Sequence, residues 1–366
     1  MPGLLQRNEQ AVTAAPPGAQ RALLLAQRVG LLARHWRTRE VPAALHAAEA
    51  AVRDAGDARA AAELELARGV ACYYGAGVQA AVEPIERARG AAHALADRGL
   101  QAECEAWLGC IAATLQQSPA RSVAHLHAAA RLGAAFRPLA AARALYVLAT
   151  LYQEAELMDH AVRHYRRATL LARRENDEQL LAAVHRYMTL AQVQQLRRAR
   201  AAGHLQARQL GQALAALGSA QQLAALLAGD DASLQFSLRL GELLRLDGQH
   251  ERALEVFEHC VAPAAQAGMT WEATIARADQ ATCLARTGRL LDAEHAGALA
   301  EAELEADAAD YVRGVVHDAL AELNELLARP QARARHATLA RAAWASDADY
   351  CARLRAALQA QEPLAD

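Results

Sequence analysis

Small and apolar residues downstream of position 240 follow the pattern of two helices packed against each other. Gly241 is a small residue at which a second helix can approach closely, and Leu244 lies on the same apolar face. Gly248 is placed to end the first helix. Ala253 then falls at the close crossing of the second helix, and Phe257, one turn later, fills the space between the pair. The pattern predicts a helix–turn–helix hairpin.

The small position of this hairpin recurs along the chain. It is found at Gly69, Gly109, Ala149, Ala191, Gly241, Ala281 and Ala321, with separations of 40, 40, 42, 50, 40 and 40 residues. Gly30 lies 39 residues before the first of these. Each helical pair leaves an apolar face that only a neighbouring pair can bury, so the period predicts a stack of about eight hairpins. We expect the ten-residue excess at 218–231 to lengthen a helix or to insert a short one.

These residues resemble the tetratricopeptide repeat (TPR), whose pattern is Leu-Gly, Tyr, Gly, Ala, Tyr or Phe, and Ala. The match covers roughly residues 20–328 and is strongest over 234–265 and 142–175. The 40-residue period is similar to that of bacterial sensor arrays, such as those of maltose-type LuxR regulators and some diguanylate cyclases. The resemblance implies an all-α, right-handed α-solenoid with a C-terminal helical cap. The parts that we expect are a loose tail (1–19), the repeat array (20–329) and a C-terminal cap (330–366). The cap is expected to contain two helices, the second of which begins after Ser346 or Asp347.

Composition supports helices and argues against most catalytic classes. Aromatic residues make up only 4% of the chain, which is too few for a large β-sheet core. All 39 basic residues are arginine. Without lysine there is no P-loop lysine, no pyridoxal Schiff base and no kinase β3 lysine. No Ser/His/Asp arrangement is recognisable either, so the sequence predicts a non-catalytic protein that needs no cofactor.

The location that we expect is the cytoplasm. Residues 1–20 lack a basic segment followed by an apolar run, so no signal peptide is expected. A membrane-spanning helix requires about 18 or more apolar residues without charge, and the sequence contains no such stretch. The six cysteines form no CxxC pair and do not suggest a disulfide framework.

Function is expected on the concave groove that the first helix of each repeat lines in the resembled family. There the array would bind a protein or peptide partner, in a regulatory or assembly role. Tyrosine and arginine favour binding hot spots, and glutamine and threonine can hydrogen-bond a peptide backbone. The same positions can also be the solvated faces of these helices. The groove residues that we predict are Tyr73, Tyr74, Arg143, Tyr146, Thr150, Gln153, Glu154, His185, Met188, Gln192, Gln195, Glu242 and Arg245. The same register adds Gln27, Arg34, Glu63, Glu103, Thr114, Gln235, Thr282 and Arg286.

Two further hypotheses remain open. Tyr73, Tyr74, Trp107, Tyr146 and His185 suggest a small-ligand sensor or an atypical helical enzyme, with a pocket inside the superhelix. A basic stretch (163–208) and an acidic stretch (292–325) suggest pairing between copies of the chain, or alternatively two solvated faces.

No metal ion, nucleic acid or membrane is expected as a partner. His160 and His164 are spaced as metal ligands on one helix face, with Glu156 one turn earlier, but they belong to no larger ligand series. The basic stretch lacks the interleaved aromatic residues of a nucleic-acid interface.

Overall fold

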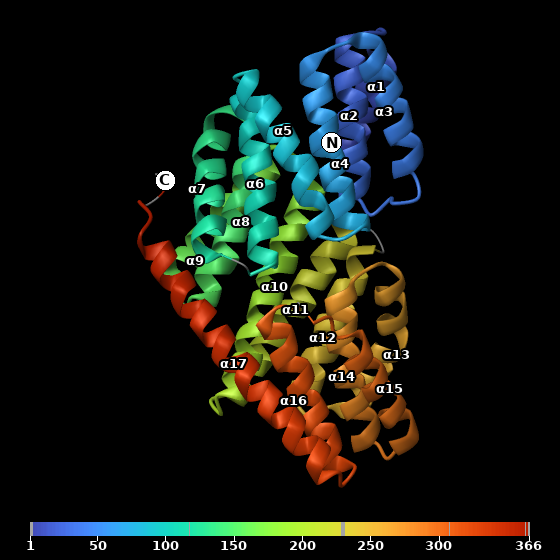
Figure 1. Ribbon diagram of the computed structural model, residues 1–366, viewed down its shortest axis with the longest axis vertical. Coiled ribbons are helices and arrows are strands. Elements are labelled where there is room, and N and C mark those ends of the chain that lie inside the picture. The colour runs from blue at the N-terminus through green and yellow to red at the C-terminus, as the bar shows by residue number, and fades with distance from the viewer. Residues whose placement is uncertain (1–2, 117, 228–230, 307, 363, 365–366) are drawn as a thin grey trace. The chain divides into compact units, whose positions relative to one another are not determined.

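The computed structural model describes residues 3–116, 118–227, 231–306, 308–362 and 364 (Figure 1). Within these ranges every regular element is a helix, as the sequence predicts. The helices are α1 (Leu4–Ala14), α2 (Ala19–Arg34), α3 (Val41–Ala55), α4 (Ala58–Gly75), the short 3₁₀ helix η1 (Gln79–Ala81), α5 (Val82–Ala94), α6 (Arg98–Thr114), α7 (Pro119–Phe136), α8 (Pro138–Glu154), α9 (Met158–Arg174), α10 (Glu178–Ala201), α11 (Ala207–Leu227), α12 (Asp231–Leu246), α13 (His250–Gln266), α14 (Thr270–Arg286), α15 (Leu290–Glu303), α16 (Asp310–Leu326) and α17 (Pro330–Gln359).

The chain divides into two compact units. Unit 1 comprises Met1–Val184 and Arg353–Asp366, and unit 2 comprises His185–Ala352. Helices α10 and α17 each contribute residues to both units. In unit 1, α2 packs on α3, α4 on α5, α6 on α7, and α8 on α9, while α4 and α8 also flank α6. In unit 2, α12 pairs with α13 and α14 with α15, and α14 also contacts α12 and α16. Each unit is therefore a stack of helical hairpins.

The eight recurring small positions confirm the predicted register. They fall one in each of α2, α4, α6, α8, α10, α12, α14 and α16, which we call the first helices of the hairpins. A Cβ atom built on Gly241 would lie 2.4 Å from Cε1 of Phe257, far inside van der Waals contact. The same construction on Gly69 meets Ile85 at 2.3 Å, within the α4–α5 hairpin. The small residue and its apolar partner are thus the crossing point of each of these pairs.

Glycine and serine form the turns between helices, and the predicted end of a first helix at Gly248 is confirmed. Gly248 and Gly288 have φ of 79° and 84°, a left-handed conformation that glycine adopts without strain. The backbone N–H of Gln249 bonds to the carbonyl of Leu244 at 2.9 Å, which closes the first helix in a Schellman-type turn. At the start of α7, Ser118 accepts a hydrogen bond from the backbone N–H of Arg121.

The two ends of the chain differ from the sequence-based expectation. Residues 4–14, assigned to a loose tail, form α1, which packs on α2. The two expected capping helices are a single 30-residue helix, α17. Neither Ser346 nor Asp347 begins a new helix, because their side chains are engaged elsewhere. Ser346 donates to Asp310, and Asp347 accepts from Nε of Arg198 at 2.7 Å. The expected break is therefore wrong.

The excess at 218–231 lengthens a helix in its described part. Helix α11 runs for 21 residues to Leu227, and residues 228–230 lie outside the described residues. In none of the described helices is there a segment long and apolar enough to cross a membrane.

We predict that Gly241→Ala destabilises unit 2 by about 1–3 kcal/mol, because the added methyl group overlaps the buried ring of Phe257. Chemical unfolding followed by circular dichroism measures the change. Gly211→Ala is the matched control. Gly211 is an exposed residue within α11 with no atom near its Cβ position, so alanine there should stabilise the helix by roughly 0.5–1 kcal/mol. Equal effects of the two substitutions would contradict the proposed crossing point.

Candidate functional site

Charged side chains of the first helices in unit 1 meet because they share a position in the repeat. Glu63 of α4, Glu103 of α6 and Arg143 of α8 are spaced by 40 residues, so stacking brings them to one level. Arg137, just before α8, binds Glu63 through two nitrogens at 2.8 and 3.2 Å. Its Nε also lies 3.3 Å from Glu103, which forms a further ion pair with Arg143. With the pair Arg34–Asp177, these residues form what we call the unit 1 charge cluster.

The unit 1 charge cluster is electrically balanced. Burial acts to raise the pKa of Glu103, but the guanidiniums of Arg143 and Arg137 outweigh it and hold that pKa below its usual value. Burial likewise opposes ionisation of Asp177. Its ion pair with Arg34, at 2.5 Å, and a hydrogen bond from the N–H of Leu180 lower its pKa. All these carboxylates are therefore paired with arginine.

Four aromatic rings lie beside this cluster. The ring of Tyr74 is 5.1 Å from that of Trp36 and 5.2 Å from that of Tyr73, in edge-to-face contacts. Tyr73 reaches Trp107 at 5.3 Å, and the guanidinium of Arg143 lies 4.2 Å from the centre of that ring. Trp36 has φ of 57°, a conformation that costs a bulky residue about 1–2 kcal/mol. The aromatic group thus includes a strained tryptophan at a turn position that is occupied by glycine in some of the other hairpins, such as Gly248 and Gly288.

Unit 2 has its own buried charge cluster. Arg197 of α10 donates to Glu242 of α12 at 2.9 and 3.1 Å and also binds Asp279 of α14. Arg239 binds the other oxygen of Glu242, and Arg245 pairs with Asp279 at 3.0 Å. The side chains of Glu242 and Asp279 are fully buried. Because burying unpaired charge is very costly, these groups hold α10, α12 and α14 in one arrangement.

The predicted groove residues fall into three groups by burial. Those that are buried are Arg143, Tyr146, Thr150, Gln153, Glu242 and Arg245. Those that are half-buried are Tyr73, Tyr74, Glu154, His185, Gln192 and Gln195. Met188 is exposed. The structure brings Tyr73, Tyr74 and Arg143 into the same group of contacts, and it joins Glu242 and Arg245 through Arg197 and Asp279. His185, Met188, Gln192 and Gln195 all follow the unit boundary on α10.

Several residues that complete these clusters escape the sequence-based prediction. They are Arg137, Asp177, Arg197, Arg239, Asp279 and Glu322, the last of which pairs with Arg245 at 2.9 Å. The repeat period could have indicated some of these residues. Arg239 and Asp279 are 40 residues apart, which is one period, and Glu242 and Glu322 are 80 residues apart, which is two periods. Arg137 and Asp177 lie at helix starts, outside the window in which a first-helix face is sought.

The residues considered for metal binding have another role. His160 and His164 both stack on Tyr152, with ring centres 5.0 and 5.1 Å apart. Over the described ranges no group of three or more His, Cys, Asp or Glu side chains is arranged to hold a metal ion.

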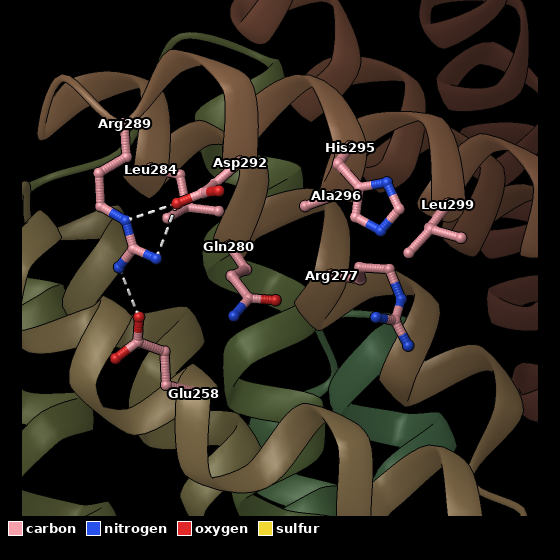
Figure 2. Close-up of a pocket in the computed structure, with 9 residues that line it drawn as sticks. All are labelled: Glu258, Arg277, Gln280, Leu284, Arg289, Asp292, His295, Ala296 and Leu299. Carbon is pink, nitrogen blue, oxygen red and sulfur yellow. Dashed lines mark hydrogen bonds and ion pairs between the residues drawn. The ribbon is translucent and has the colours of Figure 1, made fainter.

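The acidic stretch 292–325 is largely neutralised within unit 2. Glu294, Glu301, Glu303 and Asp310 form ion pairs with Arg329, Arg335, Arg277 and Arg313. Helices α13, α14 and α15 also border a shallow polar pocket (Figure 2). There Arg289 bridges Glu258 and Asp292, at 2.6 and 2.8 Å, as the dashed lines in the figure show. Much of the acidic charge that the sequence suggested for pairing between copies is therefore already paired with arginine within unit 2.

Comparison with solved structures identifies the fold. One match is a Rap protein complexed with competence and sporulation factor, with a TM-score of 0.65 and 14% identity over 95% of this chain and 92% of that one. A second is the Rap conjugation gene regulator of the plasmid pLS20 in complex with the Phr* peptide, with a TM-score of 0.55 and 14% identity over 90% and 97% of the two chains. The chain shares the fold of these Rap proteins. No protein-family model and no curated protein matches it.

The likeness confirms the all-α stack of helical hairpins. It extends over nearly the whole of both chains, so the shared architecture includes both units and is not limited to a few repeats. At 14% identity it establishes the fold and carries no information about individual residues.

We predict that Glu242→Gln lowers the free energy of unfolding by about 3–5 kcal/mol, because Arg197 and Arg239 would then share too little negative charge in a buried site. Urea unfolding measures the loss. Glu258→Gln removes the ion pair between Glu258 and Arg289, which lies at the surface. The side chain of Glu258 is 42% exposed and that of Arg289 is 48% exposed. This substitution should leave stability nearly unchanged. Similar losses in both variants would show that burial of the cluster does not matter.

Proposed function

We propose that this chain is a non-catalytic regulatory protein that binds a peptide on its first helices and controls a protein partner. The observation that carries the proposal is the likeness to a Rap regulator solved with a peptide bound, which spans 90% of this chain and 97% of that one. The finer resemblance to the sensor arrays of bacterial regulators belongs to the same proposal. So does a cytoplasmic location, which the scattered cysteines support.

The chemistry of the first helices supports peptide binding. A peptide offers backbone N–H and C=O groups at every residue, and half-buried polar side chains such as Gln192 and Gln195 can pair with them. Half-buried Tyr73 and Tyr74 offer flat apolar surface at little cost in side-chain entropy. The buried ion pairs beneath fix these helices in advance, which reduces the ordering that binding would otherwise require.

The domain assignment is also part of the proposal. We assign the repeats to residues 20–329 and the cap to the segment that follows. A terminal repeat needs a covering element because its outer face has no neighbour. Trp344 of α17 packs on Tyr311 of α16 with ring centres 5.9 Å apart, which supports this role for α17.

We predict that the protein retains members of a random pool of short peptides during gel filtration, with mass spectrometry as the readout. Tyr74→Ala combined with Glu154→Ala should reduce retention at least tenfold, because both side chains are half-buried on first helices. The control is Glu83→Ala, on the second helix α5, where the side chain is 86% exposed. It should retain the wild-type set.

Retention that is unaffected by the double substitution would place binding elsewhere. A pool that yields no retained peptide would contradict the proposed function. Retention of a metabolite in place of peptides, lost in the same double variant, would support the small-ligand hypothesis that the ring group of Tyr73, Tyr74 and Trp107 favours.

A further inference from the structure

Three arginines of unit 2 converge on one carboxylate near the ends of the first helices. Glu322 of α16 accepts from Arg200 of α10 at 2.7 Å and from Arg245 of α12 at 2.9 Å through one oxygen. Its other oxygen accepts from Arg286, the last residue of α14, at 3.0 Å. One negative charge thus faces three positive charges contributed by three different helices.

The three arginines differ in their access to solvent. The side chain of Arg245 is only 4% exposed and also pairs with Asp279, so it belongs to the buried cluster. The side chains of Arg200 and Arg286 are 40% and 44% exposed. A guanidinium carries five N–H donors in a planar fork, and Glu322 takes one from each of these two residues. Arg200 and Arg286 therefore present donors to solvent while Glu322 fixes their positions.

The groups around Glu322 carry more positive than negative charge. His250, the first residue of α13, is close enough for Arg245 and Arg286 to lower its pKa, after the larger effect of burial. Asp318, one turn before Glu322, is a second carboxylate near Arg200 and Arg245. Burial raises its pKa, although the indole N–H of Trp344, which donates to it at 2.8 Å, and the two arginines act to lower that pKa. Asp279 is already paired with Arg197 and Arg245.

The titration of Arg200 agrees with this charge balance. Burial lowers its pKa, and repulsion from Arg245 lowers it further, so that Glu322 does not restore the usual value. Arg197, which lies between two carboxylates in the same unit, has a raised pKa despite its burial. Burial is the main cause of the lowered pKa of Arg200, and the repulsion from Arg245 means that an added anion nearby would favour its charged form.

We propose that Arg200 and Arg286, held on either side of Glu322, bind a carboxylate of the peptide ligand. The inference rests on the proposed peptide-binding function and adds the chemistry that the ligand must carry. Arginine forks match the two oxygens of a carboxylate in geometry as well as in charge. The carboxylate is either the C-terminus of the peptide or an acidic side chain, and both present the same group to the two arginines.

The experiment uses the full chain and three pools of short peptides that share the same neutral side chains. The first pool has a free C-terminus, the second is amidated, and the third is amidated with one aspartate. Retention on gel filtration is measured by mass spectrometry for the wild type, Arg200→Gln and Arg286→Gln. The control is Arg289→Gln, which removes an arginine of similar exposure (48%) that pairs with Glu258 on a second helix.

We expect the wild type to retain the first or the third pool at least tenfold more than the second. Preference for the first pool identifies a C-terminal carboxylate, and preference for the third identifies an acidic side chain. The preference should fall to about onefold in Arg200→Gln and Arg286→Gln, persist in Arg289→Gln, and weaken at high salt. Melting curves of each variant confirm that it is folded.

Two results would overturn the inference while leaving the proposed function intact. The first is equal retention of all three pools by the wild type. This result decides against a carboxylate preference without any measurement on a variant. The second is a preference for carboxylate that survives in both Arg200→Gln and Arg286→Gln. If no pool is retained at all, the proposed function fails together with the inference.

Discussion

The close crossing of two helices at a small residue sets the packing of the hairpins in each unit. In the α12–α13 hairpin, Gly241 lets the ring of Phe257 lie against the backbone of the first helix. Leu126 plays the same part for Gly109 in unit 1, where an added Cβ would come within 2.6 Å. Because the crossing recurs about every 40 residues, it fixes the level of each first helix relative to the next. Side chains at the same position of successive repeats are therefore brought into contact by the stacking alone.

The inner charges show what that register achieves. Glu63, Glu103 and Arg143 occupy one repeat position, and with Arg137 they form a network that spans α4, α6 and α8. A buried ion pair adds little net stability compared with apolar packing, since desolvation offsets most of the attraction. Its contribution is specificity, because a slipped repeat would leave a charge buried without a partner. In unit 2 the same logic places more arginine than carboxylate at the exposed end of the cluster, around Glu322.

The sequence was sufficient to predict the repeat, its crossing points and its turns, because these depend on residues that are close in sequence. The Gly241–Phe257 contact and the turn at Gly248 are of this kind. Ion pairs between residues far apart were not predicted. Arg34 and Asp177 are 143 residues apart, and nothing local to either indicates the other. The helix break expected near Ser346 failed for the same reason, since Asp310 and Arg198 bind the residues that would have capped it.

Hydrogen exchange of the full chain, with and without a retained peptide, shows which helices a bound peptide protects. If the repeat register builds a binding face on the first helices, added protection should appear on α4, α6, α8, α10, α12, α14 and α16. The second helices α5, α7, α13 and α15 should change little. Protection confined to the second helices, or spread evenly over both sets, would contradict the account.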